Sequence, residues 1–341
     1  MDKCGNVQQK VSCIFETSVI DEPTSKRQFQ GYKVIATDVI KNSALTSNVT
    51  QASVTEKLDG TCVYIAEYQG QPWLWSRLDR KPNKAGDKRF KRFQSLHQKW
   101  EQGPKDTSEP SFDWNIEKDF KEVPDQWIPA SGVQVVNGQV QPDNSRHIPG
   151  WVPLDKKSRQ YCWHVSAVDL DRGLGLFLVQ SKNSLKCLQI EVLPLHHAVG
   201  HTAELIGTHV NGNAYNIGSK RNPLHFLVIH GSIALTEPPD ISLAAIRSWF
   251  SSTQVGLVEG IVWHCQNGNL FKIHRHHLNL TWPLKDETPI FSKKKVEILV
   301  DISQLESEDN MNPVFIKLGR LFHKTCDSLV HLDQLLDTCE Q

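Results

Sequence analysis

A lysine lies between two carboxylates in the stretch TEKLDG, where Glu56 precedes Lys57 and Asp59 follows it by two positions. On an exposed loop, this pattern is an ordinary pair of solvated charges. At the mouth of a strand, the same lysine can act as a nucleophile if its amine loses its proton. An unperturbed lysine has a pKa of about 10.4, so partial burial or a neighbouring cation would have to lower it.

A second set of candidates lies in VEGIVWHCQNGNLFKIHRHHL, residues 258–278. Two apolar runs flank Asn-Gly at 267–268, which is the strongest short signal for a β-hairpin. With these two residues at the centre of the turn, Lys272 is expected to face Trp263 across the strands. The segment therefore predicts a hairpin with a defined register.

That register places Glu259, Lys272 and His274 on one face, because side chains alternate along a strand. Core packing does not explain an acid and two cationic candidates on the same face of an apolar hairpin. A carboxylate such as Glu259 can hold Mg²⁺, usually with water completing the shell. Lys272 can lower the pKa of Lys57, or neutralise a phosphate under attack. The set suits attack of Lys57 on the α-phosphate of a nucleotide.

The order of these stretches resembles that of the motifs in the covalent nucleotidyltransferases, the superfamily of ATP-dependent ligases and capping guanylyltransferases. Over nearly the whole chain, the sequence is similar to the animal RNA ligases that join 5′-phosphate and 3′-hydroxyl ends. The strings that carry the likeness are TEKLDGTC, RLDRKPNK, HIPGWVP, ELIGT with the NGN that follows it at 211–213, PLHFLVIHG, EGIVWHC and KIHRHHL. The resemblance implies an α+β, nucleotidyltransferase (ATP-grasp-like) fold with antiparallel sheets around a nucleotide pocket.

The same resemblance implies a three-step reaction that uses ATP and Mg²⁺ or Mn²⁺. Lys57 attacks ATP and becomes lysyl-AMP, so the protein labels itself with AMP. The AMP then passes to an RNA 5′-phosphate, and a 3′-hydroxyl displaces it and seals the strand. The expected role is RNA repair. A non-catalytic RNA-binding protein on the same scaffold and a GTP-dependent capping enzyme are the alternatives.

The resemblance also assigns roles to single residues. Catalysis is assigned to Lys57 and Lys272, with Lys272 contacting the α-phosphate, and the metal is assigned to Glu259. The role of binding the nucleotide is assigned to Glu56, Asp59, Gly60, Arg77, Glu204, Lys272 and His274.

His274 is a departure from the family pattern, because it stands where the family has a second lysine. Either a protonated or hydrogen-bonding imidazole takes that role, or Arg275 does. No RxDK follows the hairpin and fewer than 60 residues remain. This leaves little room for an OB-fold domain, so DNA ligation and capping are less favoured.

The chain is expected to have three parts. Residues 1–40 form N-terminal strands that pack on the core, and residues 41–290 form the adenylyltransferase domain with an insertion at about 102–160. Residues 291–341 form a mostly helical C-terminal segment. Within the second part, a helix is predicted at 86–101.

The stretch at 77–93 is strongly basic, with eight Lys or Arg side chains against two Asp. The whole chain carries a net charge of zero, so any phosphate binding must come from such a patch. The stretch is either a solvated helix face or a phosphate track for RNA.

Composition limits the other possibilities. The eight cysteines are widely scattered, and no CxxC pair indicates a zinc ribbon. The HxHH run at 274–277 lacks the pattern of a zinc-binding helix, and His230 is interpreted as a satisfied histidine at a strand end. No long apolar segment is present, so neither a membrane span nor a secretory signal is expected. The cytoplasm or the nucleus is the expected compartment.

Overall fold

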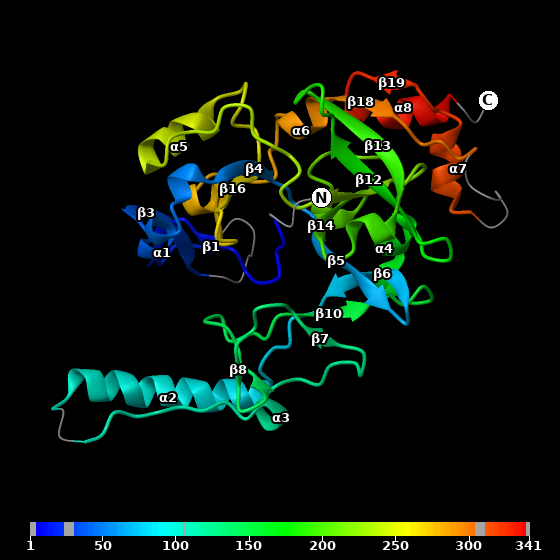
Figure 1. The fold of residues 1–341 in the computed structure, drawn as a ribbon. Coiled ribbons are helices and arrows are strands. Elements are labelled where there is room, and N and C mark those ends of the chain that lie inside the picture. Colours follow the sequence, from blue (N-terminus) through cyan, green and yellow to red (C-terminus); the bar gives the residue numbers. More distant parts are fainter. Residues whose placement is uncertain (1–4, 24–30, 105–106, 304–310, 339–341) are drawn as a thin grey trace. The chain divides into compact units, whose positions relative to one another are not determined.

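The computed structural model describes residues 5–23, 31–104, 107–303 and 311–338. The chain divides into two compact units (Figure 1). The main unit comprises the residues up to Leu74 and those from Leu154 onward, and the inserted unit comprises Trp75–Pro153. The predicted insertion at 102–160 overlaps the inserted unit, which also takes in the basic stretch.

A large mixed sheet forms much of the main unit. Its strands follow the spatial order β19-β18-β13-β12-β15-β14-β5-β6. The β12–β15 and β13–β18 pairs are parallel, and the other pairs from β19 to β5 are antiparallel. The bounds are β5 (Thr61–Tyr68), β6 (Gln71–Arg77), β12 (Leu174–Gln180), β13 (Cys187–Pro194), β14 (Thr202–Gly207), β15 (His225–Ile229), β18 (Lys295–Ile298) and β19 (Thr325–Cys326), with β11 (Val168–Asp169) beside β12.

Central strands of this sheet send successive side chains into two different apolar cores, one on each face. Leu176 and Leu178 pack in one apolar cluster, and the intervening Phe177 packs in another. Ile206 and Leu205 divide between the same two clusters. The helices α6 (Ile290–Lys293), α7 (Pro313–Gly319) and α8 (Leu332–Asp337) bring apolar side chains to the first cluster.

A second sheet in the main unit has four strands in the order β1-β17-β16-β4. These are β1 (Ser12–Cys13), β17 (Leu270–His274), β16 (Gly260–His264) and β4 (Ser53–Lys57). The pair β1–β17 is parallel, and the other two pairs are antiparallel. Ile261 and Ile273 share an apolar core with Ile246 and Phe250 of α5 (Leu243–Ser251).

The predicted hairpin is confirmed, but its register is wrong by one residue. Lys272 pairs with Val262 rather than with Trp263. The cause lies in the turn, where Cys265 N donates to Asn269 O at 3.0 Å and Gly268 has φ +84°. The loop therefore has three residues and a glycine in the left-handed region, a common alternative to the two-residue turn.

Other short elements complete the main unit. The strands β2 and β3 form an antiparallel hairpin with an irregularity between Phe15 and Thr17. The bounds are β2 (Phe15–Ile20), β3 (Lys33–Ile40), α1 (Asn42–Thr46) and α4 (Cys162–Ser166). From residue 291 on, the described chain combines α7 and α8 with β18 and the edge strand β19.

The inserted unit is built around the helix α2 (Lys84–Gln102), which confirms the helix predicted at 86–101. Asn83 caps its N-terminus by accepting from Gly86 N at 2.9 Å. One side of α2 packs its aromatic rings against Phe112 and Trp114. The remaining elements are α3 (Ile116–Asp119), β7 (Ile128–Pro129), β8 (Val135–Val136), β9 (Gln139–Val140) and β10 (Gly150–Pro153).

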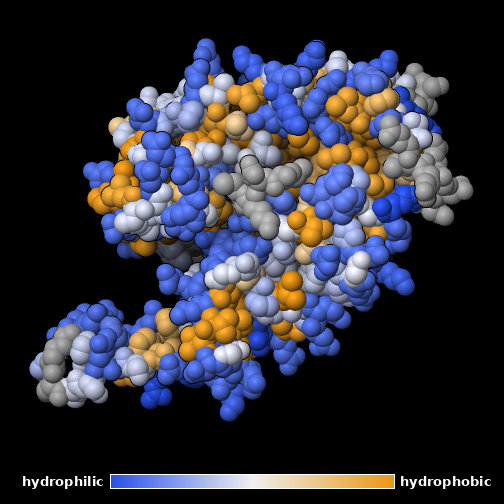
Figure 2. All heavy atoms as spheres, in the orientation of Figure 1, coloured by the Kyte–Doolittle hydropathy of each residue, from blue (hydrophilic) through white to orange (hydrophobic). Residues whose placement is uncertain are grey.

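The basic side chains of α2 are exposed, and Figure 2 shows hydrophilic residues over much of the visible face of this helix. Arg89 also pairs with Asp119 of α3. The charges of this helix therefore face solvent rather than a core.

The α+β class is confirmed, since helices accompany both antiparallel and mixed sheets. None of the sheets in the described residues closes into a barrel. No helix in this part of the chain has both the length and the apolar character that a membrane span needs.

Candidate active site

Lys57 is the last residue of β4, and its amine meets the carboxylate of Glu259. The distance from Lys57 Nζ to Glu259 Oε2 is 2.6 Å, and the two side chains are 22% and 7% exposed. Lys57 Nζ also donates to Leu58 O at 3.2 Å. Lys57 pairs with Gly260 across β4 and β16, so Glu259 lies directly beside the end of β4. Lys57 is thus a largely buried ion-pair partner.

The charge state of Lys57 differs from the expectation. Burial disfavours the charged amine, but the carboxylates of Glu259, Glu204 and Asp59 outweigh that effect and raise the pKa of Lys57 above its ordinary value. The prediction that Lys272 lowers the pKa of Lys57 is therefore wrong while Lys57 is paired with Glu259. Of the three carboxylates, Glu259 raises the pKa of Lys57 most.

Glu259, the partner of Lys57 in this ion pair, also has a shifted pKa. Burial raises its pKa to about 7, although the Lys57 amine lowers it. A buried carboxylate whose charge is only partly compensated suits a hard divalent cation, and Mg²⁺ commonly takes one or two carboxylates and keeps several waters. The residue fits the predicted metal role, which stays a prediction.

Lys272 joins this group from β17. Burial, followed by the charge of Lys57, lowers the pKa of Lys272 to about 8. The two amines therefore do interact, but the pKa that falls is that of Lys272. Glu259, in a bend just before β16, forms the ion pair with Lys57, and its charge also acts on Lys272.

His274 is a neutral imidazole near neutral pH. Its ring stacks on His277 with centroids 3.7 Å apart. Burial, then the charges of His277 and Lys272, depress the pKa of His274 far below its usual range. If His274 takes the role of the family's second lysine, it can do so as a neutral, hydrogen-bonding imidazole. A protonated imidazole does not agree with the lowered pKa.

Arg275 has a structural position instead. It is buried, and its guanidinium donates to Gly256 O at 2.8 Å and to Thr281 O at 3.0 Å. These bonds hold the segment after the hairpin, so Arg275 does not fit the role of a second phosphate-binding cation.

Asp59 orients the loop that follows Lys57. Its carboxylate accepts from Trp282 Nε1 at 2.8 Å and from Asn211 Nδ2 at 3.0 Å, and its backbone N donates to Tyr215 Oη at 2.7 Å. Neither motif nor spacing identified Trp282 or Tyr215 as part of the site, and Asn211 stood in the NGN string without an assigned role. Their positions, more than 150 residues from Asp59, give no local signal.

Gly60 allows a close approach between this loop and the large sheet. A Cβ added at Gly60 would lie 2.2 Å from Leu205 O. The Gly60 N donates to Glu204 Oε1 at 2.9 Å, so one carboxylate oxygen of Glu204 fixes the loop. The sequence prediction that Asp59, Gly60 and Glu204 belong to one site agrees with this geometry, while their contacts with a nucleotide stay predictions.

Glu56 is buried beside Lys294. Burial raises its pKa to about 7, with Lys294 acting in the opposite direction, and its Oε1 has no hydrogen-bond partner among the described residues. Glu56 and Lys57 are adjacent in β4, and adjacent strand residues point to opposite faces. The contact of Glu56 with the nucleotide stays a prediction.

Arg77 lies in the inserted unit. Its Nε contacts Asp79 Oδ1 at 2.6 Å, and its guanidinium lies 4.8 Å from the centroid of the Trp151 ring. These contacts place Arg77 within its own unit, and its predicted contact with the nucleotide stays a prediction.

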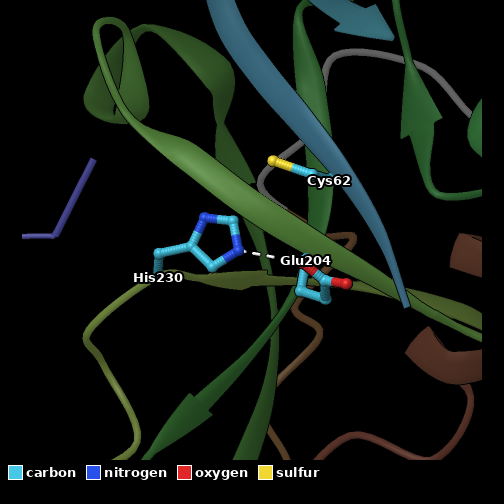
Figure 3. Close-up of side chains that lie close together, drawn as sticks. All are labelled: Cys62, Glu204 and His230. Atoms are coloured by element: carbon cyan, nitrogen blue, oxygen red, sulfur yellow. Dashed lines mark hydrogen bonds and ion pairs between the residues drawn. The ribbon is translucent and has the colours of Figure 1, made fainter. Parts of the chain in front are cut away.

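His230 follows β15 and holds the second oxygen of Glu204. Its Nε2 lies 2.9 Å from Glu204 Oε2, and its Nδ1 lies 2.9 Å from Thr202 Oγ1. Both ring nitrogens have partners, which confirms the interpretation of His230 as a satisfied histidine at a strand end. Figure 3 shows Cys62 close to the same pair.

Comparison with known proteins shows which family this chain resembles. The model of the RNA ligase 1 family matches residues 1–334. RNA ligase 1 of Mus musculus is 49% identical over 286 residues, which cover 84% of this chain and 85% of the mouse protein. RNA ligase 1 of Danio rerio is 46% identical over 323 residues, covering 94% of this chain and 96% of the fish protein. RNA ligase 1 of Rattus norvegicus is 44% identical over 329 residues, covering 96% of this chain and 98% of the rat protein. The chain therefore belongs to the RNA ligase 1 family.

Proposed function

We propose that this protein is an ATP-dependent RNA ligase that joins 5′-phosphate and 3′-hydroxyl ends through lysyl-AMP and AMP-RNA, in RNA repair in the cytoplasm or nucleus. Two observations support the proposal together. The relatives bear the name RNA ligase 1, and Lys57 Nζ lies 2.6 Å from Glu259 in a largely buried site. A binding module has no need of a buried lysine facing a buried carboxylate.

In this proposal the chain's own residues prepare Lys57 for attack. When Glu259 no longer faces the amine, the largest opposing charge is gone, and burial with the charge of Lys272 favours the neutral form of Lys57 against the remaining Glu204 and Asp59. Asp59 and Gly60, held by Trp282 and Glu204, keep the loop after Lys57 in place. The neutral amine then displaces pyrophosphate from ATP by attacking the α-phosphate.

Two side chains would handle the developing charge. Lys272, with a pKa of about 8, is mostly charged near neutral pH and can stabilise the α-phosphate oxygens. Glu259 would hold Mg²⁺ or Mn²⁺, which when bound supplies positive charge beside the phosphates. His274 would donate or accept a hydrogen bond as a neutral imidazole.

The test is adenylylation of the full chain with ATP labelled at the α-phosphate. We expect label on wild type with Mg²⁺ or Mn²⁺, loss of label when RNA with a 5′-phosphate is added, and no label on Lys57→Ala. Lys182→Ala, which changes a lysine outside this site, is the matched control. Absence of label on wild type with both ions would refute the proposal.

The exposed basic face of α2 supports a second candidate, a non-catalytic RNA-binding protein. It predicts RNA binding that weakens with salt and does not change in Lys57→Ala, with no AMP adduct. A capping enzyme would instead take label from GTP, so comparing labelled ATP with labelled GTP separates the two enzymes.

A further inference from the structure

Three side chains of different chemistry meet on one face of the large sheet, at residues 62, 204 and 230. Their potential ligand atoms, one each from Cys62, Glu204 and His230, all lie within 4.8 Å of one another (Figure 3). The register explains the meeting. Glu204 pairs directly with Cys62 across β14 and β5, and with Val228 across β14 and β15. His230 is two residues beyond Val228 and so lies on the same face.

We infer that Cys62, Glu204 and His230 form a binding site for a thiophilic divalent cation of the zinc type, and that its occupation inhibits the enzyme. A thiolate, an imidazole and a carboxylate are the three ligand classes of zinc in proteins. Mg²⁺ and Ca²⁺ prefer oxygen ligands alone, so this site is chemically distinct from the Glu259 site. Three protein ligands leave a fourth tetrahedral position for water.

Thr202 supplies the support that a metal-binding histidine needs. Its hydroxyl lies 2.9 Å from His230 Nδ1 and accepts from Val7 N at 2.7 Å. A hydroxyl can donate to Nδ1 or accept from it, so it serves both tautomers of His230. Once the proton between Nε2 and Glu204 has left to solvent and Nδ1–H is held by Thr202, the lone pair of Nε2 faces Glu204 and Cys62, as in other metal sites where an outer partner orients the imidazole.

Binding exchanges protons for the ion. The Cys62 thiol loses its proton, and the proton shared by His230 Nε2 and Glu204 Oε2 is displaced. The His230 and Glu204 side chains are 17% and 14% exposed, so an ion can reach them from solvent. Cys62 is partly buried, its Sγ lies 3.9 Å from Val7 O, and no disulfide joins it to another of the described cysteines.

The inhibitory effect follows from Glu204 and rests on the proposed function. Its Oε1 holds Gly60 N, three residues after Lys57, while its Oε2 faces His230. A bound ion would fix Glu204 toward Cys62 and His230, and would place positive charge where the nucleotide is predicted to bind. Occupation should therefore slow the formation of lysyl-AMP.

The binding test uses Co²⁺ as a spectroscopic substitute for Zn²⁺ on the full chain. We expect a thiolate-to-cobalt charge-transfer band that saturates at one equivalent in wild type and in Cys162→Ser, and is lost in Cys62→Ser. No such band in wild type, or an equal band in Cys62→Ser, would overturn the site.

A second measurement needs no variant at this position. Zn²⁺ should slow alkylation of Cys62 by iodoacetamide at least about tenfold, with Cys162 unaffected, as read from peptide masses. Equal alkylation of Cys62 with and without Zn²⁺ would also overturn the site.

The regulatory part is tested by the ratio of AMP labelling with and without micromolar Zn²⁺, at fixed Mg²⁺ and ATP. We expect Zn²⁺ to lower labelling of wild type, and Cys62→Ser to require at least about ten times more Zn²⁺ for half-inhibition. Equal inhibition of both proteins would overturn the inhibitory role. If wild type takes no label even without Zn²⁺, the proposed function fails, whereas the cobalt test of the site still stands.

Discussion

The two units of the chain handle charge in opposite ways. In the main unit, Lys57, Glu259 and Glu56 are buried or nearly so, and burial with neighbouring charges shifts their pKa values. In the inserted unit, the cations of α2 are exposed to solvent. Buried charges respond strongly to single changes, whereas exposed charges act together and are screened by salt. The buried site of the main unit is therefore suited to chemistry, and α2 is a candidate surface for an extended polyanion.

The largest expected effect is on the buried pair. Glu259→Gln should lower the rate of AMP labelling by on the order of a hundredfold or more, because it removes the carboxylate assigned to the metal while keeping its shape. The measurement is single-turnover labelling with Mg²⁺ and with Mn²⁺. Glu237→Gln, at an acid outside the site, is the control, and labelling of Glu259→Gln at the wild-type rate would remove Glu259 from the mechanism.

Glu56 should make the main unit less stable as pH rises. Its pKa is about 7 in the folded chain against 4.5 for an ordinary Glu, so the folded state binds the proton more tightly. The stabilisation is complete below pH 4.5 and is lost as pH rises through 7, a change of about 3 kcal/mol. Urea unfolding from pH 5 to 8 should show this slope in wild type and a flatter curve in Glu56→Gln. Parallel curves for the two proteins would contradict the assigned cause.

A smaller effect is expected at the support of the lysine loop. Trp282→Phe keeps an aromatic ring but removes the donor to Asp59 Oδ2, which leaves a buried carboxylate oxygen with one partner fewer. The expected cost is about 1–3 kcal/mol in the free energy of unfolding, together with slower AMP labelling. Trp249→Phe, whose indole donates to Glu237 O at 2.7 Å on an exposed site, should cost less. The reverse order would show that Asp59 does not depend on Trp282.

The smallest effect on stability is expected on α2. Replacing Lys84, Lys88, Lys91 and Arg92 by Gln should change the free energy of unfolding by less than about 0.5 kcal/mol per site, since all four are exposed. RNA binding should weaken, and the slope of log K against log salt should fall by roughly 0.7 for each RNA phosphate that the variant no longer neutralises. An unchanged slope would show that α2 is only a solvated face.

Sequence reasoning was most successful where the signal was local. The hairpin at 260–274 and the helix at 86–101 were both predictable, from Asn-Gly between apolar runs and from helical spacing. The predicted register of the hairpin was wrong because a two-residue turn and a three-residue turn can both contain Asn-Gly. Only the folded backbone shows which turn is formed. The predicted direction of the pKa shift of Lys57 was wrong because the net shift depends on the distances from its amine to three carboxylates.

By itself, the sequence determined the family, the candidate nucleophile Lys57 and its candidate acid Glu259, because rare residue strings persist in order along the chain. Tertiary structure alone decided which groups meet. Trp282 and Asn211 reach Asp59, and Cys62 meets His230 across β14. The physical reason is that sheet pairing joins residues more than a hundred positions apart, and both burial and Coulomb energies depend on the resulting distances rather than on spacing along the chain.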